Sequence, residues 1–235
     1  MTTTKPAGRA PSRTKRPYVI AIDGPAGAGK STVAKGVARA MRFAHLDTGA
    51  MYRAITAKAI AEGIDPTDER ALAGLARATE IDFGPKGMTI DGEPPGRTLR
   101  TRTVSRWVST VSAHRTVRRE LVRIQRQILS KGEIVAEGRD IGTVVCPNAA
   151  VKVYLTASVD ERARRRHKEM EEAGEAVPFE TLRTEIRKRD RLDSTRSISP
   201  LAPAQDAVVV DSTGKTPRQV VAEIVALAVA RRPSR

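Results

Sequence analysis

Apolar residues follow two patterns along the chain, and the two patterns alternate. Short runs of β-branched and small apolar residues, typical of buried strands, occur at 18–22, 44–46, 133–136, 150–155 and 207–210. Longer stretches with apolar residues three or four positions apart predict helices at 30–41, 47–62, 68–79, 101–112, 115–131, 159–173, 178–193 and 217–230. Strands separated by helices indicate an α/β fold built on a doubly wound parallel sheet.

The segment 81–97 interrupts this alternation. Its sequence, IDFGPKGMTIDGEPPGR, has turn-forming residues every few positions with short apolar runs between them. This pattern predicts a small antiparallel β unit separate from the main sheet. We find no internal repeat.

A glycine-rich loop follows the first strand, and it has the spacing of a phosphate-binding P-loop. Gly24 is followed after four residues by Gly29, Lys30 and Ser31. Small residues let successive N–H groups point at one phosphate, and the helix beginning near Lys30 adds its positive end. Lys30 can reach the β and γ phosphates, and the Ser31 hydroxyl can ligate Mg²⁺. The alternative is a glycine-rich turn that binds nothing. The loop residues expected to bind ATP are Gly24, Pro25, Ala26, Gly27, Ala28, Gly29, Lys30, Ser31 and Thr32.

Composition narrows the class of protein. The 235 residues fit one α/β domain with a small inserted lobe, and aromatic residues make up only 3%. A single cysteine, Cys146, cannot form an internal disulfide, which favours a reducing compartment. The chain has no apolar run long enough to span a membrane and no apolar leader at its start. We therefore expect a cytoplasmic protein that does not bind membranes.

The formal net charge of +15 is concentrated in two segments. Residues 1–16 contain five Lys or Arg and no acid, and their composition predicts a disordered basic tail. Residues 97–139 contain eleven Lys or Arg against three Glu. Such a segment suits nucleic acid, a small phosphorylated substrate or a solvated helix face. The P-loop favours the small substrate.

Charged residues also follow two of the predicted strands. Thr48 and Arg53 come after the second strand, and Glu137, Arg139 and Asp140 come after the third. In a doubly wound sheet these positions lie at the same edge as the P-loop, where ligands bind. An arginine there suits a phosphate, and an aspartate can accept from an exocyclic amine. The simpler interpretations are a helix cap with an exposed Arg53 and a surface ion pair of Arg139 with Asp140.

Arginines are frequent in residues 160–196, although this segment is close to neutral, with eleven basic and ten acidic residues. Arg162 and Arg166 are four residues apart and share a helix face. For most of these arginines, salt-bridged surface helices explain the pattern. The alternative is a mobile lid whose few inward arginines close on phosphates and exclude water.

Over residues 18–231 the chain resembles bacterial cytidylate kinases, within the superfamily of nucleoside-monophosphate kinases. The resemblance rests on seven motifs in order: IDGPAGAGKST (22–32), LDTGAMYR (46–53), RTRTVS (100–105), EGRDIGTVV (137–145), EIRKRD (185–190), LDSTR (192–196) and VVVDST (208–213). It implies transfer of the ATP γ-phosphoryl group to CMP or dCMP, with Mg²⁺ as cofactor. It also implies a five-stranded sheet, a lid and an enlarged monophosphate-binding lobe containing the β unit.

The resemblance also implies roles for individual residues. Lys30, Arg139, Arg189, Arg162 and Arg166 correspond to catalytic positions, the last two to lid arginines that meet ATP. Ser109, Arg118 and Asp140 fall where the family recognises cytosine. The remaining expected CMP contacts are Thr48 and Arg53 at the phosphate, Arg139, Arg189 and Arg196 at the phosphate or sugar, and Asp193 at the ribose. Two departures are Thr48, where a serine is usual, and Glu137, which replaces an aspartate of some members and offers a carboxylate near Mg²⁺.

The implied organisation is a tail (1–16) and a single kinase domain (17–235). Its core comprises about 18–47, 132–158 and 205–232, its monophosphate-binding lobe about 48–131 and its lid about 159–196. Three alternatives remain open. They are a kinase for UMP or AMP, a P-loop protein that binds nucleic acid, and a regulatory NTPase. Only Trp107 offers an aromatic ring within 97–139, which argues against single-stranded nucleic acid. We expect a monomer with ATP and CMP or dCMP as partners.

Overall fold

The computed structural model describes residues 17–84 and 87–232. It has a five-stranded parallel sheet in the order β2-β5-β1-β6-β7. The strands are β1 (Val19–Asp23), β2 (Ala44–Asp47), β5 (Ile134–Gly138), β6 (Val151–Thr156) and β7 (Val208–Asp211). The α/β fold with a five-stranded parallel sheet is therefore confirmed.

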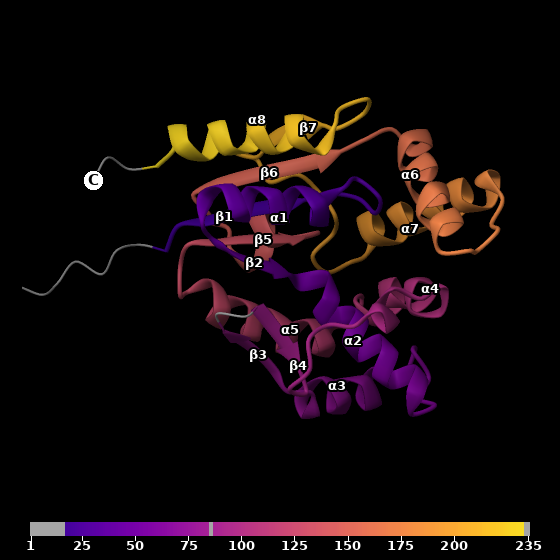
Figure 1. Ribbon diagram of the computed structural model, residues 1–235. Coiled ribbons are helices and arrows are strands. Elements are labelled where there is room, and N and C mark those ends of the chain that lie inside the picture. The colour runs from indigo at the N-terminus through magenta and orange to yellow at the C-terminus, as the bar shows by residue number, and fades with distance from the viewer. Residues whose placement is uncertain (1–16, 85–86, 233–235) are drawn as a thin grey trace, which may run out of the picture.

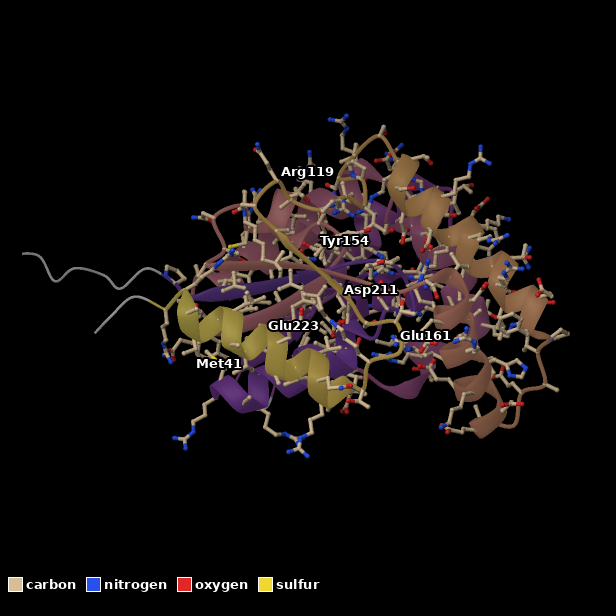
Figure 2. The ribbon with its side chains drawn as sticks, turned by 90° about the horizontal axis from the view of Figure 1, so that it is seen from above. Met41, Arg119, Tyr154, Glu161, Asp211 and Glu223 are labelled. Carbon is tan, nitrogen blue, oxygen red and sulfur yellow. The ribbon has the colours of Figure 1, made fainter. Side chains whose placement is uncertain are left out.

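Alternate residues of the strands face two separate apolar cores. Val19 and Ala21 of β1 belong to one core, while Ile20 and Ile22 belong to the other. On the second face lie α1 (Lys30–Met41) and α8 (Pro217–Ala230), which pack against each other. Figure 1 shows both helices on one side of the sheet, and Figure 2 shows α8 running beside α1, near Met41 and Glu223. Because both faces are covered, the strands contain few polar residues except at their carboxyl ends.

The segment between β2 and β5 forms a lobe below the sheet in Figure 1. It comprises α2 (Thr48–Ala61), α3 (Glu69–Ala78), the antiparallel pair β3 (Ile81–Gly84) and β4 (Gly87–Ile90), the short 3₁₀ helix η1 (Arg97–Arg100), α4 (Arg102–Val111) and α5 (Arg115–Leu129). The predicted antiparallel unit is thus present. Asp47, Asp68 and Thr101 each accept a backbone N–H at a helix start, which explains where α2, α3 and α4 begin.

Two antiparallel helices project beyond the carboxyl ends of the strands, on the right in Figure 1. They are α6 (Val159–Glu172) and α7 (Phe179–Thr195), and they pack mainly on each other. Met170, Val177 and Leu182 form a small apolar cluster of their own between these helices. This cluster is separate from the two cores that face the sheet.

Most predicted elements agree with the structure within one or two residues. The sequence did not predict η1 or η2 (Ile141–Val145), a single turn of π-helix directly after Asp140. The predicted disordered tail at 1–16 lies outside the described residues. Among the helices that the structure describes, none is both long and apolar enough to cross a membrane.

Two helical glycines give a matched test of how tightly α1 packs on α8. A Cβ at Gly36 of α1 would lie 2.6 Å from Cγ2 of Val221, whereas a Cβ at Gly74 of α3 meets nothing within 4 Å. Alanine stabilises a helix interior by about 1 kcal/mol relative to glycine, and overpacking costs about 1–3 kcal/mol. We expect Gly74→Ala to raise the free energy of unfolding and Gly36→Ala to lower it, measured by urea denaturation. Equal effects of the two changes would contradict this packing.

Candidate active site

A cleft of about 1040 Å³ opens at the carboxyl ends of β1, β2 and β5, between the P-loop, the lobe and the α6–α7 pair. Pockets that hold one drug-sized ligand have volumes of about 300–1,000 Å³, so this cleft is at the upper end of that range. Its lining contains thirteen Lys or Arg and seven Asp or Glu. An excess of positive charge in a concave site favours anionic ligands.

The P-loop wraps the start of α1, and its glycines are required by its shape. Gly24, Gly27 and Gly29 have φ values of 151°, 76° and 87°, which side chains rarely tolerate. A Cβ at Gly24 would lie 1.9 Å from the carbonyl oxygen of Leu155, so the loop could not approach β6. No side chain caps the first turn of α1. Its N–H groups are therefore available for a phosphate.

Lys30 lies in the first turn of α1 with its ammonium buried. Its Nζ donates to the carbonyl oxygen of Pro25 at 2.6 Å, which bends the side chain back over the loop. Burial lowers the pKa of Lys30 well below its usual value, and the positive charges of Arg139 and Arg189 lower it further. Phosphate oxygens bound in the loop would supply the negative charge that this group needs.

Ser31 is the first link of a chain of polar side chains. Its Oγ donates to Oε2 of Glu137 at 2.8 Å, and the other oxygen, Oε1, lies 2.9 Å from Nε2 of His45. Thr48 Oγ1 donates to the backbone carbonyl of Glu137 at 2.7 Å. The ends of β2, β5 and the P-loop are thus joined at one point, beside the expected Mg²⁺ position.

Asp23 is a buried residue that the sequence analysis did not single out. Its two carboxylate oxygens accept the backbone N–H groups of Ile141 and Gly142 at 2.8 and 2.7 Å. Burial nevertheless raises its pKa to about 6. These bonds tie the end of β1 to η2, which immediately follows Asp140. The partners are more than one hundred residues away, so no local pattern could have identified them.

Arg118 and Asp140 form a buried ion pair on the opposite wall of the cleft. The Arg118 guanidinium also donates to the Ser112 carbonyl and lies 5.3 Å from the ring centre of Tyr52. Arg196 approaches the second oxygen of Asp140 at 3.9 Å. Within the described residues, Arg118 Nε and Arg196 Nη2 are buried without a hydrogen-bond partner. A ligand with acceptors would satisfy them, because unpaired buried donors are costly.

Asp193 lies within 4 Å of three other expected site residues. One of its oxygens accepts from Ser109 Oγ at 3.0 Å, and the other accepts from Arg139 Nε at 3.0 Å. Arg189 lies 3.9 Å from the same carboxylate. These positive neighbours keep the pKa of Asp193 below its usual value, although burial acts in the opposite direction. Asp193 therefore stays ionised and holds the arginines around one point.

Arg53 lies near these arginines but has no acidic hydrogen-bond partner there. It donates to the Leu99 carbonyl and to Ser105 Oγ. Burial lowers the pKa of Arg53 to about 9, and repulsion from Arg189 and Arg100 adds to the effect. Burial likewise lowers the pKa of Arg189 to about 10. Several desolvated guanidinium groups facing one space would be stabilised by an anion, and a phosphate dianion has the charge and geometry for this.

The arginines of α6 differ in where they point. Arg162 does not line the cleft: its guanidinium donates to the Ala26 carbonyl at 3.2 Å and to Asp190 at 2.5 Å, behind the P-loop. Arg166 lines the cleft and pairs with Glu169. Arg165, which the sequence analysis did not select, also lines it, and it donates to Ser212 and Glu161. Figure 2 labels Glu161 in the first turns of α6.

The other expected residues meet in this cleft. Apart from Gly24, Pro25 and Arg162, every residue expected to bind ATP or CMP lines it. The donor loop and the arginine-rich wall come from segments far apart in the sequence. No sequence signal distinguishes Arg165 from the neighbouring arginines, because its contact with Ser212 Oγ at 3.0 Å joins two segments far apart in the chain.

Comparisons with known proteins give a consistent result. The family model described as cytidylate kinase matches residues 20–230. A cytidylate kinase of Bacillus licheniformis is 49% identical over 211 residues, covering 88% of this chain and 93% of the relative. One from Bacillus subtilis is 48% identical over 211 residues, covering 88% and 94%.

Among solved structures, an uncharacterized protein from Eubacterium ventriosum superposes with a TM-score of 0.52 at 12% identity. The match covers 91% of this chain and 99% of that one. At this identity the likeness shows a shared fold alone. The family model and the curated relatives extend over nearly the whole described chain, and the cleft contains the motifs on which the resemblance rests. The chain belongs to the cytidylate kinase family.

Proposed function

We propose that the protein transfers the γ-phosphoryl group of ATP to CMP and dCMP, giving ADP and CDP or dCDP. The observation that supports this most directly is the pairing of two unlike walls in one cleft. One wall is a P-loop with a buried lysine, and the other contains the buried Arg118–Asp140 pair beside a group of arginines. The donor nucleotide would bind the P-loop wall, and the acceptor nucleotide would bind the wall that contains Arg118 and Asp140.

The acceptor wall suits cytosine. Asp140 can accept from the N4 amine, while Arg118 and Ser109 can donate to N3 and O2. Uracil has an oxygen in place of this amine, and an ionised carboxylate cannot donate to it. A base that fails to match leaves buried charges unpaired, and this produces strong discrimination.

The sugar and phosphate of the acceptor would lie between Asp193 and the arginines. Asp193 offers a carboxylate to a ribose hydroxyl, and Thr48 lies near the phosphate end. The guanidinium groups of Arg53, Arg139, Arg189 and Arg196 would neutralise the monophosphate. Burial, and after it the repulsion among these arginines, lowers the pKa values of Arg53 and Arg189, and that anion would relieve the repulsion.

The transfer itself requires no side-chain nucleophile. The phosphate oxygen of CMP is already anionic and would attack the γ-phosphorus in line with the leaving ADP oxygen. Catalysis then consists of positioning and of stabilising the charge spread over the transferred group. Lys30, Arg139 and Arg189 would do this, with Arg165 and Arg166 closing from α6. Closure would also exclude water, which otherwise accepts the phosphoryl group.

The donor set at the P-loop fits Mg²⁺. Among the described residues no group of three or more His, Cys, Asp or Glu could hold a metal ion. The Ser31 hydroxyl and the nearby Glu137 carboxylate offer oxygen donors beside the loop. Mg²⁺ prefers oxygen ligands and keeps several waters while it binds substrate phosphates, so one hydroxyl and one adjacent carboxylate suffice. When bound, the ion neutralises charge on the β and γ phosphates.

Formation of ADP with CMP, dCMP, UMP and AMP as separate acceptors tests the proposed function. We expect CMP and dCMP to stimulate ADP formation strongly, UMP less and AMP least. The assay couples ADP to the oxidation of NADH, and a reaction without acceptor measures background hydrolysis. If no monophosphate stimulated ADP formation, the proposed function would be wrong.

Two further expectations stay predictions. The substrates and the single cysteine support a cytoplasmic location. A monomer suffices for the proposed reaction, because all the residues named above come from one chain.

A further inference from the structure

We propose that His45 is a positioning residue for the nucleotide-bound Mg²⁺: it orients Glu137, and Glu137 in turn orients the hydroxyl of Ser31. This inference rests on the proposed function, because it concerns the same donor site. His45 is not among the expected site residues, and it does not line the cleft. Its effect would therefore pass through Glu137.

The strand register explains why these side chains meet. Asp47 of β2 pairs with Glu137 of β5, and His45 pairs with Val135. Side chains two residues apart share a face of the sheet, so His45, Asp47 and Glu137 lie on one face. Val135 belongs to the core beneath α1, which identifies this face as the one that α1 covers. Ser31, in the first turn of α1, stands directly over it.

The hydrogen-bond directions within the chain are determined by chemistry. A carboxylate only accepts, so Nε2 of His45 and Oγ of Ser31 must both donate to Glu137. A serine hydroxyl has one proton, and when that proton points at Glu137 the lone pairs of Oγ point elsewhere. Lone pairs directed toward the phosphate site are what a cation requires from Ser31.

Each carboxylate oxygen of Glu137 has one of these donors as its partner. Its side chain is only 4% exposed, so water has little access to replace either donor. Glu137 also faces Asp47, whose carboxylate is occupied by the Ala50 N–H and by Arg100. His45 is thus the one side chain that donates to Oε1 of Glu137 within the described residues.

Without the donor at position 45, Oε1 would be left buried and unpaired, and the carboxylate would turn to find another partner. The Ser31 proton would then lose its acceptor. Residues that orient metal ligands typically change metal affinity by about 10- to 100-fold when they are replaced. We therefore expect the affinity for the metal-bound nucleotide to fall and the affinity for the metal-free nucleotide to stay the same.

The test compares ADP binding by calorimetry in Mg²⁺ and in EDTA for three variants of the full chain. His45→Leu removes the donor, His45→Gln keeps an N–H near the position of Nε2, and His114→Gln is the matched control. His114 is similarly exposed, and its Nε2 contacts the Pro66 carbonyl away from the cleft. We expect His45→Leu to weaken binding of Mg²⁺-ADP about 10-fold and to leave binding in EDTA unchanged. We expect His45→Gln to restore most of the loss and His114→Gln to match wild type.

Equal weakening in Mg²⁺ and in EDTA would overturn the inference, since it would indicate general damage to the loop. Unchanged binding in both conditions would overturn it as well. In kinetics, the KM for Mg²⁺-ATP should rise in His45→Leu while the KM for CMP stays constant. The two proposals fail separately: a wild-type protein without CMP-dependent ADP formation contradicts the proposed function, whereas the binding comparison concerns His45 alone.

Discussion

Replacing Lys30 with alanine is expected to slow phosphoryl transfer by about 100- to 1,000-fold while the protein stays folded. The Lys30 ammonium is the positively charged side chain of the P-loop. It is buried, so water cannot take over its interaction with the phosphates. Burial makes the charge of this ammonium unfavourable and so lowers its pKa. Removing it should therefore leave the free energy of unfolding nearly unchanged or slightly higher.

Turnover under saturating ATP and CMP measures this effect, and thermal unfolding verifies the fold. Lys35→Ala is the matched control, because Lys35 lies on the same helix but is exposed to solvent. We expect Lys35→Ala to retain full turnover. Wild-type turnover in Lys30→Ala would show that the P-loop is not the transfer site.

Asp140→Asn is expected to lower kcat/KM for CMP by about 10- to 100-fold and to leave the KM for ATP nearly constant. Asparagine has the same size and can still accept from Arg118, so the buried arginine keeps a partner. It loses the negative charge that favours the cytosine amine, and its own amide can donate to the O4 oxygen of uracil. The ratio of CMP to UMP use should therefore fall further than the CMP rate itself.

Steady-state kinetics with each acceptor at fixed ATP measure both parameters. Asp206→Asn serves as the control, since Asp206 forms an ion pair with Lys152 and is largely exposed. Equal losses toward ATP and CMP in Asp140→Asn would argue against recognition of the base by this residue.

The sequence was sufficient to predict the sheet and most helices because their signals are local. A run such as VIAID has no polar residue until its last position, and GPAGAGKS has one spacing that suits a phosphate. The π-helical turn η2 had no such signal. Four of its five residues, IGTVV, are β-branched, so their pattern is that of a strand, and the turn is too short for helical periodicity.

Sequence motifs predicted individual residues of the site, but not the hydrogen bonds that join them. Ser109 meets Asp193, and Asp23 meets Ile141, across intervals that no periodicity reports. The choice among the α6 arginines also depended on tertiary structure. Arg162 and Arg166 do share a helix face, yet only Arg166 lines the cleft, because Asp190 and the P-loop carbonyl hold Arg162 behind the loop. The roles of these residues and the division into core, lobe and lid stay predictions.

The strand order has a consequence for synthesis on the ribosome. The neighbours of β1 are β5 and β6, and β2 pairs with β5 alone, so the first two strands of the chain never pair with each other. A nascent chain must therefore extend past Gly138 before β1 has a hydrogen-bonded neighbour. At translation rates of about 5–20 residues per second, this delay is on the order of 10 s. During that interval the apolar strand that leads into the P-loop remains unpaired and open to chaperones.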